Sequence, residues 1–160
     1  MSTDSSQLDS LDVVHRPYLD RAFQQALIAE SEDEVPVGAV IVRNGDIIAE
    51  AYNQKERSHK ITAHAEVLAI QKAIDTLGDW RLTDCTLYTT LEPCPMCAGA
   101  ILLARVGVVV YAERDPKFGA LESQVMLFQD TTFNHHPEVL CVYDSRSSAY
   151  LKRFFQQKRA

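Results

Sequence analysis

The order of predicted elements between residues 85 and 112 constrains the fold most. CTLYTTL at 85–91 and VGVVVYA at 106–112 are short runs typical of strands, and MCAGAILLA at 96–104 is typical of a short buried helix. Two strands joined through a helix in one sheet are parallel, and their crossover is right-handed. These residues therefore predict an open sheet covered by helices.

The first half of the chain adds a hairpin and two helices. Residues 37–52 predict an antiparallel hairpin, because Asn44-Gly45 in their middle readily adopts the positive φ angles of a two-residue turn. Apolar residues at helical spacing predict a helix that begins at Pro17, a residue suited to a first turn. A second helix is expected from about Ala63, with Gly78 as its stop.

The second half completes the same domain. EVLCVY at 138–143 predicts a fifth strand, and a closing helix follows whose one side carries Tyr150, Leu151, Phe154 and Phe155. No repeat or linker divides the chain, so we expect a single domain over residues 16–160, preceded by a flexible, Ser- and Asp-rich arm at 1–15. The expected architecture is a three-layer α/β/α domain with a mixed sheet of about five strands.

Composition limits the setting in which this domain works. The chain has 160 residues, of which 46% are hydrophobic, four cysteines, no early apolar run of signal-peptide type and no window that fits a membrane span. We therefore expect a cytoplasmic protein with reduced thiols. A net charge of −6 argues against non-specific coating of nucleic acid, although a local basic group remains near the carboxyl end, at Lys152, Arg153, Lys158 and Arg159.

Cys94 and Cys97 stand at C-x-x-C spacing at the start of a predicted helix. Their side chains share one face of its first turn, where the helix dipole favours thiolates. Such a pair binds a metal or forms a redox disulfide. The metal interpretation needs a further ligand, and His64 is the best candidate because it lies at the start of the preceding helix. If both helices begin at one edge of the sheet, the three side chains converge.

Three protein ligands would leave the fourth position of a tetrahedral zinc ion for water, as in catalytic rather than structural sites. Cys85 and Cys141 lie in apolar strands, so we interpret them as buried, inert thiols. Glu66 would lie beside the metal without binding it. A carboxylate in that place can take a proton from the zinc-activated water and deliver it to a leaving group.

HAE at 64–66 together with PCPMC at 93–97 resembles the H-x-E…P-C-x-x-C signature of zinc-dependent nucleobase deaminases. Within that cytidine-deaminase-like superfamily, the chain is most similar to bacterial tRNA-specific adenosine deaminases of the TadA type. The similarity covers most of the chain and includes EVPVGAVIV at 34–42, TAHAE at 62–66, TLEPCPMCAGAI at 90–101 and RDPKFGA at 114–120.

This resemblance implies hydrolytic deamination of adenosine to inosine at the wobble position of a tRNA anticodon loop. It also implies one zinc ion per subunit of a homodimer, with Glu66 as the proton carrier. The substrate is expected to be an unpaired loop whose target base is splayed out. The residues expected to contact the base, its neighbouring nucleotide or the phosphates are Asn53, Val35, Ala65, Asp115, Lys158 and Arg159.

Two rival functions remain open at this level. A deaminase of guanine or another free base would have the same fold, zinc motifs and glutamate. A non-enzyme, either a deaminase-like partner subunit or a redox C-x-x-C protein, is the second rival. Glu66 argues against a partner subunit, because a scaffold needs no proton carrier, and His64 argues against a purely redox pair.

Overall fold

The computed structural model describes residues 5–159, which contain a five-stranded mixed sheet in the order β2-β1-β3-β4-β5. The strand β1 is antiparallel to both β2 and β3, whereas β3, β4 and β5 are parallel to one another. The predicted parallel pair and the predicted fifth strand are thus confirmed. The strands are β1 (Gly38–Arg43), β2 (Asp46–Tyr52), β3 (Cys85–Thr89), β4 (Val108–Tyr111) and β5 (Glu138–Cys141).

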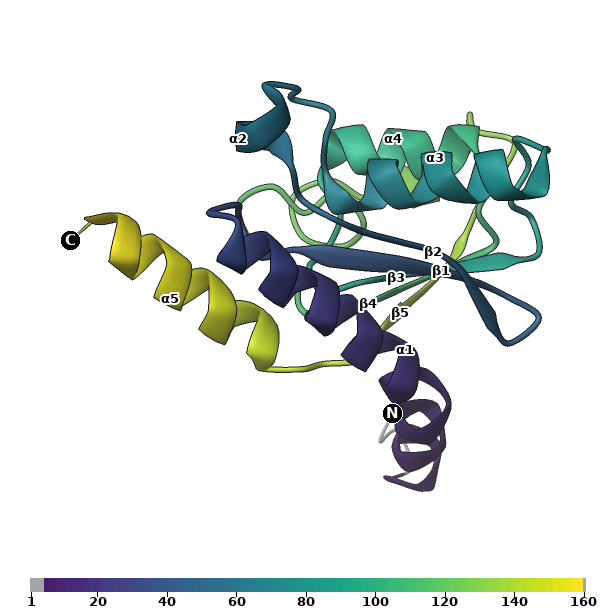
Figure 1. Cartoon of the computed structure of the whole chain (residues 1–160). Helices are drawn as coiled ribbons and strands as arrows, with labels where there is room; N and C mark the ends of the chain where they lie inside the picture. Colours follow the sequence, from purple (N-terminus) through teal and green to yellow (C-terminus); the bar gives the residue numbers. More distant parts are fainter. Residues whose placement is uncertain (1–4, 160) are drawn as a thin grey trace.

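Helices cover both faces of this sheet, as Figure 1 shows. The helices α3 (Ala65–Leu77) and α4 (Pro95–Leu103) pack on one face, and α1 (Ser5–Ser31) and α5 (Arg146–Arg159) lie on the other. A short helix, α2 (Lys55–Ser58), and a 3₁₀ turn, η1 (Leu127–Gln129), occupy loops that the sequence does not mark. The predicted three-layer α/β/α architecture is confirmed.

The strands alternate their side chains between the two layers, as a period of two requires. In β1, Ile41 belongs to the core under α3 and α4, while Val40 and Val42 belong to the core under α1. Leu87 and Tyr88 divide in the same way in β3. Both faces of the central strands are therefore buried, which explains why these segments contain so few polar residues.

Two turns have the geometry that their residue types predict. Asn44 and Gly45 have φ angles of 50° and 81°, so the β1–β2 hairpin turns through two left-handed residues. Gly78 ends α3 with a φ of 68°, and its N–H donates to the carbonyl oxygen of Ile74. Both segments end where the sequence predicts.

The start of α1 differs from the prediction, because the helix begins at Ser5 and contains Pro17 in its interior. Residues 5–15, which the sequence assigns to a flexible arm, are therefore helical, and residues 1–4 of that arm lie outside the described residues. Proline lacks the N–H donor for the helical bond to residue 13, yet α1 continues through this position. Arg16 pairs with Asp12 one turn earlier.

Tertiary contacts also hold this part of α1. The Nδ1 atom of His15 lies 2.8 Å from the hydroxyl oxygen of Tyr88 in β3. Arg16 donates from Nη1 to Asp144, in the loop before α5, at 2.6 Å. His15, the last residue of the predicted arm, and Arg16 thus belong to the layer formed by α1 and α5. The local sequence does not indicate partners so distant along the chain.

The helix α5 packs on α1 through part of the predicted apolar side. Tyr150 makes an edge-to-face contact with Phe23, and Phe154, one turn later, is buried. Phe155 was expected on this side, but 44% of its surface is exposed. One residue advances a helix by about 100°, so Phe155 points away from the face that Phe154 occupies.

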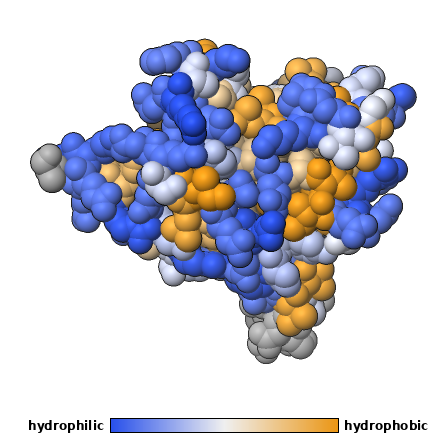
Figure 2. All heavy atoms as spheres, in the orientation of Figure 1, coloured by the Kyte–Doolittle hydropathy of each residue, from blue (hydrophilic) through white to orange (hydrophobic). Residues whose placement is uncertain are grey.

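The outer surface follows the composition. Figure 2 shows hydrophilic residues over most of the face formed by α1 and α5, with separate hydrophobic patches beside them. No helix among the described residues is both long and apolar enough to cross a bilayer.

Candidate active site

The amino-terminal ends of α3 and α4 lie at one edge of the sheet, and the candidate site is between them. His64 is the N-cap residue of α3, and Cys94 is the N-cap residue of α4. Cys97 follows in the first turn of α4 and is fully buried. The predicted convergence of the three side chains is confirmed.

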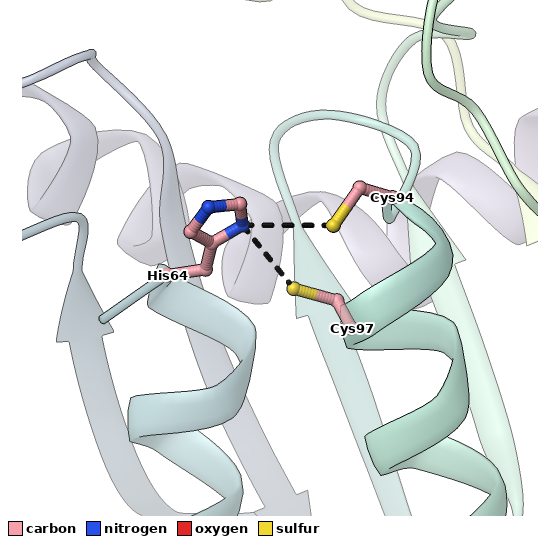
Figure 3. Close-up of side chains that lie close together, drawn as sticks. All are labelled: His64, Cys94 and Cys97. Atoms are coloured by element: carbon pink, nitrogen blue, oxygen red, sulfur yellow. Dashed lines mark hydrogen bonds between the residues drawn. The ribbon is translucent and has the colours of Figure 1, made fainter. Parts of the chain in front are cut away.

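Distances within this cluster fit a tetrahedral metal ion. The Nδ1 atom of His64 lies 3.6 Å from Sγ of Cys94 and 3.5 Å from Sγ of Cys97, as Figure 3 shows. A zinc ion with bonds of about 2.3 Å to sulfur and 2.0–2.1 Å to nitrogen separates these two atoms by about 3.6 Å at a tetrahedral angle. The three candidate ligand atoms all lie within 4.8 Å of one another, so one metal ion could be held between them.

The charges of the three groups are coupled. Hydrogen bonds with Cys97 and then with His64 lower the pKa of Cys94 to about 4. The hydrogen bond with Cys94, together with burial, raises the pKa of Cys97. The hydrogen bond with Cys94 raises the pKa of His64. Cations that bind here would displace the remaining protons, because a metal requires thiolates and a neutral imidazole.

Glu66 lies beside the cluster, on the first turn of α3, with only 4% of its surface exposed. One carboxylate oxygen, Oε2, is 3.5 Å from Sγ of Cys97, and the other, Oε1, accepts a hydrogen bond from the hydroxyl of Thr89 at 3.0 Å. Burial raises the pKa of Glu66. A buried carboxylate with a raised pKa beside three candidate metal ligands is suited to accept and return a proton.

Asn53 is held at the same helix end. Its Oδ1 accepts the N–H of Ala65 at 2.8 Å, and its own N–H donates to the carbonyl oxygen of Val37 at 3.1 Å. The side-chain amide is therefore fixed, with its NH₂ group as the remaining donor. Val35 is half-buried and packs against the core under α3 and α4.

The other predicted contact residues lie farther along the surface. Asp115 is half-buried, and its N–H donates to the carboxylate of Glu92, two residues before Cys94. Lys158 is on α5, where its Nζ lies 2.6 Å from a carboxylate oxygen of Asp33. Arg159 is the last residue of α5 and is exposed. The structure thus links Asp115 to the second metal-ligand motif and Lys158 to the end of α1.

Three polar residues of this region are missing from the sequence-based site. Thr89 donates to Glu66, Glu92 holds the loop around Asp115, and Glu34 accepts the N–H groups of two residues in α2. All three are at most 2% exposed. A carboxylate directly before an apolar residue or proline, as in EVP and LEP, is the one signal that local sequence offers for the two glutamates.

The sheet, the two helix ends and the buried glutamate define the class of zinc-type nucleobase deaminases. In agreement, a family profile described as MafB19-like deaminase matches residues 14–159. Named relatives narrow this class. A tRNA-specific adenosine deaminase of Bacillus subtilis is 47% identical over 143 residues, which are 89% of each chain. One of Agrobacterium fabrum is 43% identical over 89% of this chain and 94% of its own. The chain therefore belongs to the tRNA-specific adenosine deaminase family.

Solved structures agree with this assignment. One from a study of A-to-I editing by tRNA:A34 deaminases at the wobble position of transfer RNA has a TM-score of 0.82 and 42% identity, over 85% of this chain and 99% of that chain. A guanine deaminase from Bacillus subtilis has a TM-score of 0.62 and 36% identity, over 91% of this chain and 93% of its own. The guanine deaminase thus has the same fold, with a lower TM-score and a lower identity than the tRNA deaminase structure.

Proposed function

We propose that this protein hydrolyses adenosine to inosine at the wobble position of a tRNA anticodon loop, with one zinc ion per subunit held by His64, Cys94 and Cys97. One observation carries the proposal above all: Glu66 lies 3.5 Å from a ligand sulfur, while Thr89 occupies its second oxygen. This arrangement leaves the carboxylate next to the reacting position without making it a fourth ligand. The named relatives support adenosine in tRNA as the substrate.

A zinc ion bound here would supply a nucleophilic water at neutral pH, because it lowers the pKa of that water. Glu66 takes the proton from the water as its oxygen attacks C6 of adenine. The same carboxyl group then gives a proton to the C6 amino nitrogen, so that ammonia leaves and inosine remains. Burial of Glu66 excludes bulk water from this transfer.

The remaining side chains hold the substrate. Asn53 has its amide oxygen committed to Ala65, so its NH₂ group is the donor to an acceptor on the base. Val35 contributes an apolar wall, and Asp115 lies toward the neighbouring nucleotide. A base stacked in a duplex cannot enter a site between two helix ends, so the substrate is an unpaired loop.

A direct assay decides between RNA and free bases. Zinc-loaded protein is incubated with an anticodon-arm RNA that carries adenosine at the wobble position, with the same arm carrying guanosine there, and with free adenosine, cytidine and guanine. Ammonia release and inosine in digested RNA are measured. We expect inosine from the adenosine arm. Faster release of ammonia from free guanine than from the arm would replace this proposal with the free-base rival.

We further propose that the protein is a homodimer. An open groove beside α4 exposes large apolar side chains in water, among them Leu103, which is 78% exposed, Trp80 and Phe133. A second copy that covers this groove would remove them from solvent. Leu103→Asp should shift the protein toward a monomer in light scattering, and an unchanged mass would argue against this face.

A tRNA substrate and reduced cysteines favour the cytoplasm as the location of the protein.

A further inference from the structure

Glu92 holds a surface loop beside the metal-ligand cluster. It is 2% exposed, and its Oε2 accepts the N–H groups of Leu121, Glu122 and Ser123 at 3.0–3.1 Å. Its Oε1 accepts the N–H of Asp115 at 3.2 Å and also the hydroxyl of Ser123. One buried carboxylate thus joins both ends of the segment 115–123, and each of these hydrogen bonds is strengthened by its charge.

The middle of this segment is fixed as well. Oδ1 of Asp115 accepts the N–H groups of Lys117 and Phe118 at 2.9 and 3.3 Å. The N–H of Ala120 donates at 2.9 Å to the carbonyl oxygen of Pro93, the residue before Cys94. The loop is therefore attached to the polypeptide directly before Cys94, the first residue of the C-x-x-C pair.

Phe118 is the residue that this fixed loop displays. Its N–H is bound by Asp115, yet 66% of its surface is exposed. Lys117, beside it, is exposed too. Exposure alone is common for apolar side chains, but here the backbone on both sides of the ring is held in place, so the ring offers a fixed flat surface to a ligand. Unpaired bases stack on such rings, and a neighbouring cation suits the phosphate that follows.

We propose that Phe118 is a stacking surface for an unpaired base next to the target adenosine, and that Glu92 is the residue that positions it. The inference rests on the proposed function, since it assumes an RNA loop at the site. It names a contact that selects a single-stranded RNA over a free base, because a free base has no neighbour to stack. Glu92 touches neither the metal ligands' donor atoms nor the reacting atoms, so its effect passes through the loop.

A substitution at Gly119 can displace the same loop independently of a change at Glu92. A Cβ atom at this position would lie 2.4 Å from the carboxyl carbon and Oε2 of Glu92 and 2.6 Å from the carbonyl oxygen of Asp115. Such contacts are too short to persist, so Gly119→Ala must displace the loop from the carboxylate. Glu92→Gln disturbs the same loop from the other side, because its amide nitrogen cannot accept the N–H groups that one of the two oxygens accepts now.

The test measures stacking directly. Anticodon arms that carry the fluorescent base 2-aminopurine on the 5′ or the 3′ side of the target are bound to the Glu66→Gln protein, in which turnover is suppressed. Stacking on an aromatic ring quenches this fluorescence. We expect quenching at one of the two positions, loss of that quenching with Phe118→Ala, and its retention with Phe118→Trp. Tyr143→Ala is the matched control, because Tyr143 is 64% exposed and lies after β5, outside this loop.

Turnover with Glu66 intact separates binding from chemistry. Stacking is worth about 1–3 kcal/mol per base, so Phe118→Ala should raise KM for the arm about 5- to 150-fold and leave kcat unchanged. Gly119→Ala and Glu92→Gln should raise KM in the same direction while zinc content is kept. Hydrogen exchange at Leu121–Ser123 should quicken in both, which reports the loop itself.

The outcomes are distinguishable. No turnover of the arm by the wild type would overturn the proposed function and this inference together. Full turnover by the wild type, with unchanged KM and quenching in Phe118→Ala, would overturn the stacking contact alone. Equal losses with Tyr143→Ala would also overturn it, because any exposed ring would then serve. An unchanged KM with Gly119→Ala and Glu92→Gln, despite faster exchange of the loop, would overturn the positioning role.

Discussion

The hydroxyl of Thr89, at the end of β3, donates a hydrogen bond of 3.0 Å to Oε1 of Glu66, on the first turn of α3. This bond crosses from the sheet to the helix that carries the proposed proton carrier. It holds the carboxylate so that its other oxygen faces Cys97. The sheet thus orients the carboxylate of Glu66 in addition to supporting the helix.

Thr89→Val should therefore lower kcat while the metal is retained. The substitution keeps the shape of the side chain but removes the donor, which leaves a buried carboxylate oxygen unpaired at a cost of about 1–3 kcal/mol. We expect kcat to fall about 10-fold, measured under saturating anticodon arm. Thr86→Val, on the same strand, is the control and should keep its activity. Wild-type kcat in Thr89→Val would mean that Glu66 is aligned by its own helix.

Glu66→Gln should abolish most of the deamination. An amide cannot carry the proton, and general acid–base catalysis contributes about 100- to 10,000-fold. Single-turnover assays with zinc measured in the same sample check this result. Zinc content and affinity for the arm should stay at the wild-type values. Substantial turnover in Glu66→Gln would show that another group moves the proton.

Cys94→Ala should lose the metal. Removal of one of three protein ligands leaves two, which is too few for a stable zinc site. Elemental analysis of the purified variant measures the zinc per chain. Cys85→Ala is the matched control, since Cys85 is a buried thiol in β3 and should leave zinc unchanged. Full zinc occupancy in Cys94→Ala would contradict the assigned ligand set.

Replacement of Lys158 and Arg159 by Gln should weaken binding of the anticodon arm if both contact phosphates. Each lost contact reduces the slope of log affinity against log salt by about 0.7–0.9, so the double variant should lose about 1.4–1.8. Titrations at several salt concentrations measure the slope.

A second substitution tests the same prediction at Asp33, because the carboxylate of Asp33 pairs with Lys158 in the free protein. Asp33→Asn releases the ammonium group and should strengthen binding of the arm. If neither substitution changes affinity or slope, the end of α5 serves only to pack on α1.

Asp144 should stabilise the fold in a pH-dependent way. Burial by itself would raise its pKa, but hydrogen bonds and charge from Arg146, with the charge of Arg16, lower the pKa overall. A carboxylate whose pKa is lower when folded stabilises the protein above its unfolded pKa of about 3.9 and loses that contribution as pH falls through the folded value.

Asp144→Asn should therefore reduce the free energy of unfolding by about 1–3 kcal/mol at pH 7, and by progressively less below about pH 4. Urea unfolding at several pH values measures both. Asp46→Asn, at an exposed position on β2, is the control. A deficit that stays constant into acid would show that the charge of Asp144 is not what stabilises the loop before α5.

The sequence predicts the metal-ligand cluster well because alternation of strands and helices places helix starts at one edge of a sheet. His64 and Cys94 need only this regularity, and local motifs locate them. The partners of Glu92 cannot be found in this way, since they come from a loop 23 to 31 residues later whose conformation is irregular.

Long-range contacts also act at the two ends of the chain. Pro17 usually marks a helix start, and contacts to distant residues override that preference in α1. Likewise, the tail lysine Lys158 has its partner Asp33 across 125 residues. The local pattern therefore predicts which elements form, whereas long-range contacts decide where α1 begins and which charges are already paired.

The N-cap positions of α3 and α4 bear on how stable this protein can become. His64 and Cys94 occupy these positions, and neither side chain makes a capping hydrogen bond. Serine at position 94 would cap the helix and stabilise the metal-free protein by about 1 kcal/mol, yet it would remove a thiolate ligand. The same two sites therefore face opposing selection, and engineering for heat resistance that ignores the metal would replace them first.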